Sequence, residues 1–346
     1  LIVTGVQTCA LPIWQFLPEH PNLRYHVLPQ WCNPAVCNML YVWLVLPWRF
    51  RRKDFDLLLL AAANRRACAT RKWRTVAVVH DLSQYHVESK YDFFRTAYIK
   101  WLLPRLVRRS DVVVTACRAS AFDLTRHWHV RPERIRIDYL GFDRQRFHLE
   151  CDAAAVEAVR AKYGLQKPFL LYISRIEHPG KNHLRLIQAY ETLPEQLRMQ
   201  YDLVLGGAPW SRAEVVFDYW KKSPERDRIR LIGFVEFDEL PSLYHASALY
   251  VFPSLFEGFG LSLLEAMACG VPVACSENSS LGEVAGAAAE LFDPGSVGAI
   301  RDAIAKVLGS AERRRELIAA GLRRIELFSW EAYTARLAGY AHPAER

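Results

Sequence analysis

Short apolar runs of strand length alternate with helix-length segments along most of this 346-residue chain. In the first half the apolar runs cover residues 23–29, 55–61, 75–80, 111–116 and 134–140, and helical patterns cover 91–108 and 118–128. Continuous apolar strands separated by helices are typical of a parallel sheet that is covered on both faces. The first half therefore predicts a parallel α/β domain.

The same alternation begins again after residues 141–152, which we interpret as a linker. Expected strands cover residues 168–174, 201–207, 228–233, 248–254 and 288–294, and expected helices cover 182–193, 211–221, 238–246, 296–308 and 311–327. We therefore expect two doubly wound domains, residues 15–150 and 151–327, and a C-terminal helix within 328–346 that crosses back to the first domain. Ligands of such sheets bind beyond the carboxyl ends of the strands.

The first fourteen residues have neither the basic segment nor the cleavage site of a signal peptide. Residues 3–13, "VTGVQTCALPI", resemble the translation of a common sequencing adapter, so residues 1–14 are left out of the fold prediction. We expect the native gene to extend upstream by one strand and one helix, roughly 30 residues or more. A sheet without a central strand leaves buried backbone groups unpaired, so the chain as written is expected to express poorly or to be inactive.

Charge is unevenly distributed between the two halves. Residues 1–150 contain 23 Lys and Arg against 12 Asp and Glu, whereas residues 151–346 contain 22 against 25. A basic first half predicts an anionic partner for that half, and anionic lipid, a phosphate-bearing acceptor and nucleic acid all remain open on charge alone.

The cysteines and apolar runs indicate a reducing, cytoplasmic setting. The eight cysteines are scattered, and no second pair or histidine cluster completes a zinc site around Cys32 and Cys37, so we expect no metal. The longest apolar run, residues 39–48, contains Pro47 and is shorter than the roughly 18 residues of a membrane span.

Residues 252–276, "FPSLFEGFGLSLLEAMACGVPVACS", carry two carboxylates and two glycines between a strand and a helix. Gly258 and Gly260 leave backbone N–H groups uncovered at the start of the expected helix, where the helix dipole favours an anion. Carboxylates repel phosphate, so Glu257 and Glu265 are better suited to accept hydrogen bonds from sugar or ribose hydroxyls.

Positive charge for this site comes from a second strand end, in "YISRIEHPGKN". Arg175 follows the strand directly, and Lys181 comes six residues later. Two cations beside a helix N-terminus suit a diphosphate. Each of these residues taken alone is more often an ordinary surface residue. Their combination at two strand ends of one domain predicts a binding site.

These motifs resemble the donor domain of glycosyltransferase family 4, retaining enzymes of the GT-B fold. The resemblance is carried by "SRIEHPGKNHLRLIQAY", by "GFVEFDELPSLYHASALYVFPSLFEGFGLSLLEAMACGVPVACSENSSLGEVAG" and by "AAELFDP". In the first half, "TVAVVHDLS", "RRSDVVVTACRASAFDL" and "RIRIDYLGFDRQRF" are also similar to the family, so the likeness covers about residues 20–340. Cys117 and Gly282 depart from it, where Ser and Pro are commoner.

The resemblance implies two Rossmann-like domains facing a cleft, the first of them incomplete, and a role for each motif residue. The catalytic residues would be His80, Arg175, Lys181 and Glu257. Arg175 and Lys181 would bind the donor diphosphate, Glu257 the transferred sugar and Glu265 the ribose. Backbone N–H groups of Gly258, Phe259, Gly260 and Leu261 would contact sugar or phosphate, Gly233, Phe234 and Val235 would line the base, and His80 would lie against the donor sugar. An alternative for His80 is a core histidine that Asp81 orients.

The expected activity is retaining transfer of a hexose from a nucleotide sugar to a glycan or lipid-linked glycan in bacterial surface polysaccharide synthesis. Mannose from GDP-mannose is favoured over a UDP-hexose, and no cofactor or metal is expected. The basic, aromatic segment 91–109 is either a membrane-facing surface at the inner face of the cytoplasmic membrane or a helix packed on its sheet with a solvated face. Alternatives are another GT-B enzyme, such as an epimerase or phosphorylase, and a non-catalytic module that binds nucleic acid. No nucleic-acid motif supports the last of these.

Overall fold

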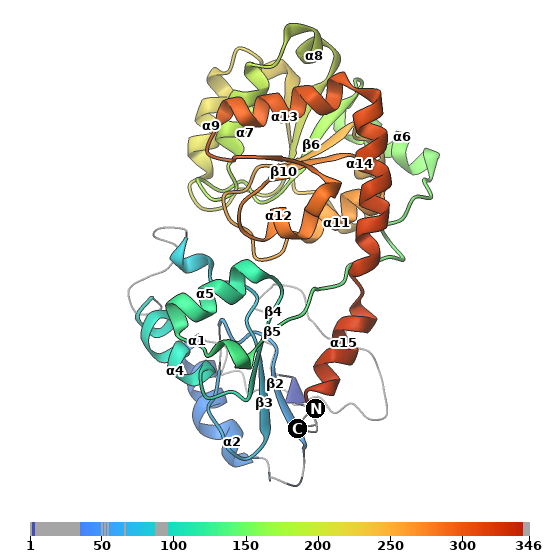
Figure 1. Ribbon diagram of the computed structural model, residues 1–346. Coiled ribbons are helices and arrows are strands. Elements are labelled where there is room, and N and C mark those ends of the chain that lie inside the picture. Colours follow the sequence, from blue (N-terminus) through green and yellow to red (C-terminus); the bar gives the residue numbers. More distant parts are fainter. Residues whose placement is uncertain are drawn as a thin grey trace.

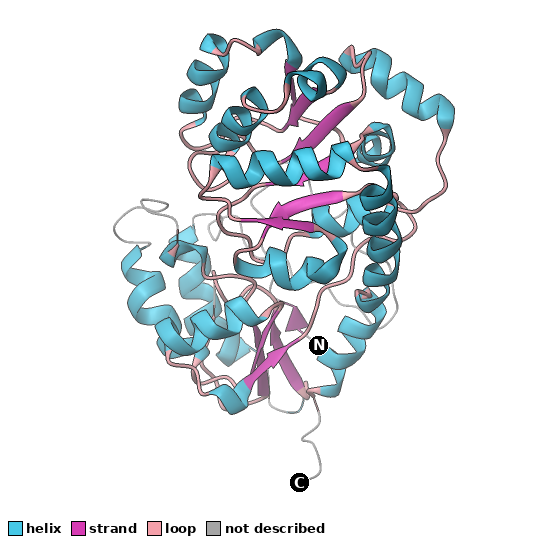
Figure 2. Ribbon diagram, turned by 45° about the horizontal axis from the view of Figure 1, so that its top comes forward, coloured by secondary structure: helices cyan, strands magenta, loops and turns pink. Residues whose placement is uncertain are grey.

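The computed structural model describes residues 2–3, 35–49, 51, 53, 55–65, 67–86 and 96–341. These residues form two α/β domains, one above the other in Figure 1. Each domain is built on a parallel sheet, and helices cover both faces of the second sheet (Figure 2). The prediction of two doubly wound parallel-sheet domains is confirmed. The expected strand at residues 23–29 lies outside the described residues.

The first domain contains a five-stranded sheet in the order β1-β2-β3-β4-β5. Its strands are β1 (Ile2–Val3), β2 (Leu57–Leu60), β3 (Arg74–Val78), β4 (Val112–Thr115) and β5 (Ile135–Ile137). Its α-helices are α1 (Ala35–Leu40), α2 (Leu46–Arg49), α4 (Leu103–Val107) and α5 (Arg118–Trp128). Every residue of β2 and β4 is buried, because Leu and Val side chains on both faces of the sheet are covered.

Two features of this domain differ from the prediction. The sequence predicts no strand within residues 1–14, yet Ile2–Val3 pair in parallel with Leu58 and Leu59. The outer edge of β2 offers unpaired backbone groups, and an extended apolar dipeptide satisfies some of them. The sequence predicts no helix over the apolar residues 39–48, yet these residues fall within helical segments that bury Tyr41 and Val42.

The second domain contains a six-stranded sheet in the order β11-β10-β9-β6-β7-β8. Its strands are β6 (Phe169–Ile173), β7 (Asp202–Gly206), β8 (Ile229–Gly233), β9 (Leu249–Phe252), β10 (Val273–Ser276) and β11 (Glu290–Phe292). The first strand of this sheet along the sequence is β6. The next two, β7 and β8, lie on one side of it, and β9, β10 and β11 lie on the other side. The strand order therefore reverses between β6 and β9, and a crevice opens at the carboxyl ends of strands on either side of such a point.

The helices of the second domain include three that the sequence did not predict. The expected ones are α7 (His183–Glu191), α9 (Ala213–Lys222), α10 (Leu240–Ala246), α11 (Leu261–Ala268), α13 (Val297–Gly309) and α14 (Ala311–Arg324). The additional ones are α6 (Ala153–Tyr163), α8 (Glu195–Gln200) and α12 (Ser279–Ala285). The side chain of Asp152 caps α6 by accepting hydrogen bonds from the backbone of Ala154 and Ala155, so the predicted linker ends in a helix start.

The C-terminal helix α15 (Trp330–Gly339) runs from the second domain to the first (Figure 1). Arg336 forms an ion pair with Asp138 at 2.9 Å, and the Tyr340 hydroxyl donates a hydrogen bond to the same carboxylate at 2.8 Å. A Cβ atom on Gly141 would lie 2.1 Å from the backbone nitrogen of Trp330, so only glycine allows this approach. Helix α15 is therefore fastened to the first domain by packing and by charge.

The domains also touch directly beside the strand ends. Glu283 on α12 accepts a hydrogen bond from the backbone N–H of Arg118 at 2.7 Å and another from the Tyr139 hydroxyl at 2.9 Å. A Cβ atom on Gly258 would lie 2.9 Å from the Cβ of Asp81. The loop after β9 is thus pressed against the loop after β3.

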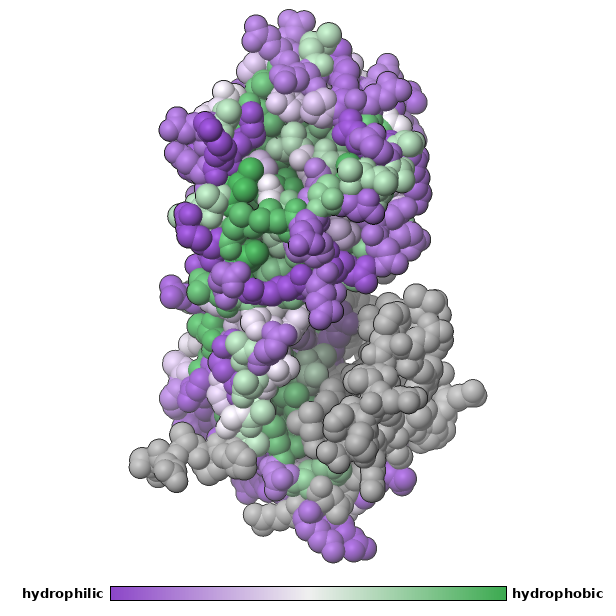
Figure 3. Space-filling view, turned by 90° about the vertical axis from the view of Figure 1, so that its right-hand side faces the viewer, coloured by the Kyte–Doolittle hydropathy of each residue, from purple (hydrophilic) through white to green (hydrophobic). Residues whose placement is uncertain are grey.

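The outer surface is largely polar where the second domain meets solvent. Figure 3 shows hydrophilic side chains over most of that domain on the face in view, with hydrophobic side chains in a smaller area. Among the described residues, no helix combines the length and the apolar character needed to cross a lipid bilayer.

Candidate functional site

A cavity of about 440 Å³ lies between the two domains, at the carboxyl ends of their strands. The first domain contributes His80, Asp81, Ala116 and Leu140, and the second contributes Ile173, Ser174, Lys181, Phe252, Glu257, Gly258, Phe259, Gly260, Leu261, Ser262 and Glu265. Most of the residues predicted from the motifs therefore line one cavity, at the point where the strand order reverses.

Lys181 and Glu257 form an ion pair across this cavity. The Lys181 Nζ atom lies 2.6 Å from Glu257 Oε1, and the two side chains are 18% and 14% exposed. Lys181 precedes α7 in the loop after β6, and Glu257 lies in the loop after the neighbouring strand β9, so adjacent strand ends bring them together. The tyrosine hydroxyl of buried Tyr172 holds the loop by donating to the Lys181 carbonyl oxygen at 2.9 Å. The Lys181 ammonium group has three N–H donors, so it can bind an anion in the cavity while it keeps a contact with Glu257.

The N-terminus of α11 opens into the same cavity. Its N-cap residue, Gly260, has a φ of 95° and no side chain to cap the first backbone N–H groups. A Cβ atom there would also lie 2.5 Å from Leu281 Cδ2, so glycine is required by both conformation and space. The uncapped N–H groups and the helix dipole give this end of the cavity a preference for an anion.

Glu265 lies on α11 with its carboxylate in the cavity wall. Burial raises the pKa of Glu265 to about 7, and the Tyr244 hydroxyl partly offsets this rise by donating a hydrogen bond to Glu265 Oε2 at 3.1 Å. Tyr244 belongs to α10 and is fully buried. Tyr244 is not predictable as part of the site, because nothing local in the sequence connects α10 to α11.

His80 follows β3 and faces the cavity from the first domain. Its Nε2 atom lies 2.9 Å from the carbonyl oxygen of Ala61, so Nε2 carries the proton and Nδ1 is the nitrogen that can accept. The carbonyl oxygen of Ala61 therefore fixes this ring, while the Asp81 carboxylate accepts a hydrogen bond from the backbone N–H of Ser83 at 3.1 Å.

Two of the predicted elements do not line the cavity. The Arg175 guanidinium lies over the ring of Trp210, 5.0 Å from its centroid, and forms an ion pair with Glu177 at 3.6 Å. Gly233 is the last residue of β8, two strands away from β6, and Phe234 and Val235 follow it; Phe234 is 67% exposed. A planar guanidinium gains from stacking on an aromatic face, which explains the position of Arg175.

A second cavity, about 650 Å³ in volume, lies against the edge strand β8. Its lining includes Lys162, Trp220, Arg226 and Arg230. It contains none of the predicted site residues, and it lies at the side of the sheet rather than at the reversal of strand order. The interdomain cavity is therefore the candidate site.

Two family models match the chain, one in each half. The model described as "Glycosyltransferase Family 4" matches residues 10–146, and the model described as "Glycosyl transferases group 1" matches residues 156–324. The boundary between them falls close to the junction of the two domains.

Several characterised proteins are similar to this chain in sequence. The O-antigen chain mannosyltransferase B of Escherichia coli is 34% identical over 264 residues, which cover 76% of this chain and 68% of that protein. The serotype-specific mannosyltransferase WbdA of Escherichia coli is 32% identical over 271 residues, which cover 77% of this chain and 33% of that protein. The chain thus spans about two thirds of the first relative and one third of the second.

Solved structures share the fold at lower identity. Sucrose-phosphate synthase from Thermosynechococcus elongatus matches with a TM-score of 0.64 at 24% identity, over 77% of this chain and 67% of that one. WaaG, a glycosyltransferase involved in lipopolysaccharide biosynthesis, matches with a TM-score of 0.61 at 18% identity. The match covers 78% of this chain and 75% of the WaaG chain. Both family models, a mannosyltransferase relative above 30% identity and two parallel-sheet domains around one cavity lead to the same assignment: this chain is a glycosyltransferase of family 4 with the GT-B fold.

Proposed function

We propose that this enzyme transfers mannose from a nucleotide sugar to a glycan or lipid-linked glycan in bacterial surface polysaccharide synthesis, with retention of the anomeric configuration. GDP-mannose is the favoured donor and a UDP-hexose the second choice. The observation that carries the proposal is the ion pair of Lys181 and Glu257 beside the uncapped N-terminus of α11. The similarity to mannosyltransferases named for O-antigen and serotype supports the sugar and the pathway class.

In the transfer step, the bond between the anomeric carbon and the diphosphate oxygen breaks while the acceptor oxygen bonds to that carbon on the same face. Negative charge develops on the departing diphosphate, which also takes the proton of the acceptor hydroxyl. Lys181 and the N–H groups at the start of α11 would stabilise that charge, because both line the cavity before the donor binds. No metal is needed for this step.

The two carboxylates have different tasks. Glu257 lies in the loop beside Lys181, where it would accept hydrogen bonds from hydroxyls of the transferred sugar. Glu265 lies on α11 beside Tyr244, where it would hold the ribose. His80 faces them from the first domain with Nδ1 available to accept a hydrogen bond from the sugar.

Glu265 should make nucleotide binding depend on pH. Because its pKa is raised to about 7, the carboxyl is mostly neutral near pH 6 and mostly ionised near pH 8, and the ionised form is the better acceptor for ribose hydroxyls. Affinity for the nucleoside diphosphate should therefore rise by up to about tenfold over this range. Calorimetry at several pH values measures it, and Glu265→Gln should lose this part of the slope. Equal slopes in the two proteins would contradict the assignment.

The acceptor is proposed to approach the first domain, close to a membrane surface. Ile99, Leu103 and Leu106 pack inward, whereas Trp101 is 66% exposed and Lys100 is also exposed. The outward face therefore combines an aromatic ring with positive charge, as membrane-surface helices do. This face favours a lipid-linked acceptor over a free one.

Vesicle binding tests this surface. Lys100→Ala should weaken binding to anionic phosphatidylglycerol vesicles by roughly fivefold, since a charge near such a surface contributes about 1 kcal/mol. Lys222→Ala removes an exposed charge from α9 of the second domain and serves as the control. Co-sedimentation measures the fraction of each variant that is bound to the vesicles. If the two variants bound equally, the membrane-facing surface would lie elsewhere.

A panel of nucleotide sugars tests the proposed function as a whole. We expect transfer from GDP-mannose to a mannose-terminated acceptor, with an α-linked product identified by proton NMR. Conversion of the donor without an acceptor would favour an epimerase, and transfer of glucose from UDP-glucose alone would exclude the mannose assignment. An inverted, β-linked product would contradict retention.

A further inference from the structure

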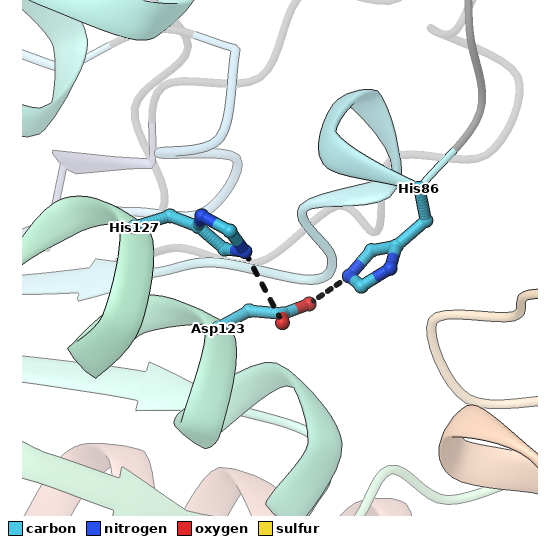
Figure 4. Close-up of side chains that lie close together, drawn as sticks. All are labelled: His86, Asp123 and His127. Atoms are coloured by element: carbon cyan, nitrogen blue, oxygen red, sulfur yellow. Dashed lines mark hydrogen bonds and ion pairs between the residues drawn. The ribbon is translucent and has the colours of Figure 1, made fainter.

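Three side chains with metal-binding atoms lie together in the first domain, outside the cavity already described. Asp123 and His127 are four residues apart on α5, so they share one face of that helix, and His86 ends the turn after Ser83–Tyr85 (Figure 4). The ligand atoms of the three side chains all lie within 4.8 Å of one another. Among the described residues, they form a compact group of two imidazoles and one carboxylate.

The carboxylate at the centre of this group is buried. The Asp123 side chain is 5% exposed, and its Oδ2 atom lies 2.7 Å from His86 Nε2. His127 Nε2 lies 3.9 Å from the other oxygen, Oδ1, which is too far for a hydrogen bond. No described Lys or Arg forms an ion pair with Asp123. A buried carboxylate with two imidazoles and no described Lys or Arg partner favours the binding of a cation.

We propose that His86, Asp123 and His127 bind one divalent transition-metal ion, of which Zn²⁺ is the best match. Two imidazoles and a carboxylate are a ligand set that Zn²⁺ accepts, with a fourth position left to water. Tetrahedral coordination at about 2.0–2.1 Å places ligand atoms about 3.3 Å apart. The three ligand atoms, one from each residue, lie within 4.8 Å of one another, so the most widely separated pair must approach by at most about 1.5 Å when the ion binds.

Solvent reaches the site from the histidine side. The His86 and His127 side chains are 36% and 26% exposed, so an ion can enter and a water can complete its coordination. Each ring would then carry its proton on Nδ1, with Nε2 on the ion. The Tyr85 ring stacks on His127 at a centroid distance of 4.3 Å and limits the rotation of that ligand.

The site is connected to the donor-binding domain through His86. The ring of His86 stacks on Phe256 with centroids 4.2 Å apart and planes 13° from parallel. Phe256 directly precedes Glu257 in the loop after β9. An ion that fixes His86 therefore also fixes one contact between the first domain and the loop that carries Glu257, although it takes no part in the transfer step.

Metal titration of the purified full chain tests the site. The measurement uses a Cys151→Ser background because that thiol is exposed and could bind metal itself. Co²⁺ should bind with one-to-one stoichiometry and give the intense visible bands of tetrahedral coordination, and Zn²⁺ should displace it. Asp123→Asn and His127→Gln should each lower the affinity at least tenfold. His129→Asn is the matched control, because His129 is an exposed residue of the same segment and asparagine tolerates its φ of 50°.

Thermal unfolding provides a readout that does not depend on transfer. Zn²⁺ should raise the Tm of the parent and of His129→Asn but not of Asp123→Asn or His127→Gln, because only a ligand of the folded state stabilises it. His127 is partly exposed, so its variant should fold even if Asp123→Asn does not. Binding that is absent in the parent, or unchanged in His127→Gln, would overturn the proposal and leave Asp123 as the hydrogen-bonded partner of His86 alone.

Discussion

Replacing Lys181 with alanine is expected to lower sugar transfer by ten- to a hundredfold. The variant removes a charge-assisted contact to the departing diphosphate, which contributes roughly 1.5–3 kcal/mol. It also leaves Glu257, a 14% exposed carboxylate, without its partner beside a second anion. Initial rates with saturating acceptor and calorimetry with the nucleoside diphosphate should both report the loss.

Arg175→Ala is the informative comparison. Arg175 is half exposed and lies over Trp210, outside the cavity lining, so its removal should cost less than the removal of Lys181. Lys222→Ala, on the exposed surface of α9, controls for a general change in net charge. A larger effect at Arg175 than at Lys181 would show that the guanidinium turns toward the donor and is the main diphosphate ligand.

Replacing Glu257 with glutamine should reduce transfer by a similar factor but leave diphosphate affinity unchanged or higher. Glutamine keeps the volume and loses the charge that pairs with Lys181 at 2.6 Å, so the lysine becomes fully available to the diphosphate. Transfer falls because an amide is a weaker acceptor for the sugar hydroxyls than a carboxylate. Steady-state kinetics and calorimetry on the same preparation separate the two effects.

The double variant Lys181→Ala with Glu257→Gln tests whether the pair acts as a unit. Residues in direct contact are coupled, so the combined loss of transfer should be smaller than the product of the two single losses. Independent, multiplicative losses would mean that the ion pair seen between these residues does not persist when the donor binds.

The strand ends were predictable because their signals are local. A strand pattern followed by Lys181, and a second followed by Glu257, already place both residues at one edge of a parallel sheet. Gly260 is a local signal for the start of α11, because glycine is the residue that most readily adopts a positive φ, which is 95° at this position. Lys181, Glu257 and Glu265 were therefore expected in one crevice, His80 was added by the family resemblance, and all four line one cavity.

Contacts between distant elements were not predictable in this way. The hydroxyl of Tyr244 reaches Glu265 from another helix, and the Arg175 guanidinium turns to Trp210, a residue after a different strand. Both arrangements depend on how elements pack, which a linear pattern does not record. The group of His86, Asp123 and His127 is of this kind too, because only the tertiary fold brings the turn after β3 against α5. The start of α6 is a different case, since Asp152 is a local capping signal within the predicted linker.

Hydrogen exchange of backbone amides in the presence of a nucleoside diphosphate tests the central assignment most directly. If the interdomain cavity holds the donor, GDP should slow exchange at the start of α11, from Leu261 onward, and in the loop that ends at Lys181. Lys181→Ala should abolish that protection at the same nucleotide concentration. Protection confined to the lining of the larger cavity, at the edge strand β8 and at Trp220 and Arg226 beside it, would instead place the nucleotide on the side of the sheet and contradict the account.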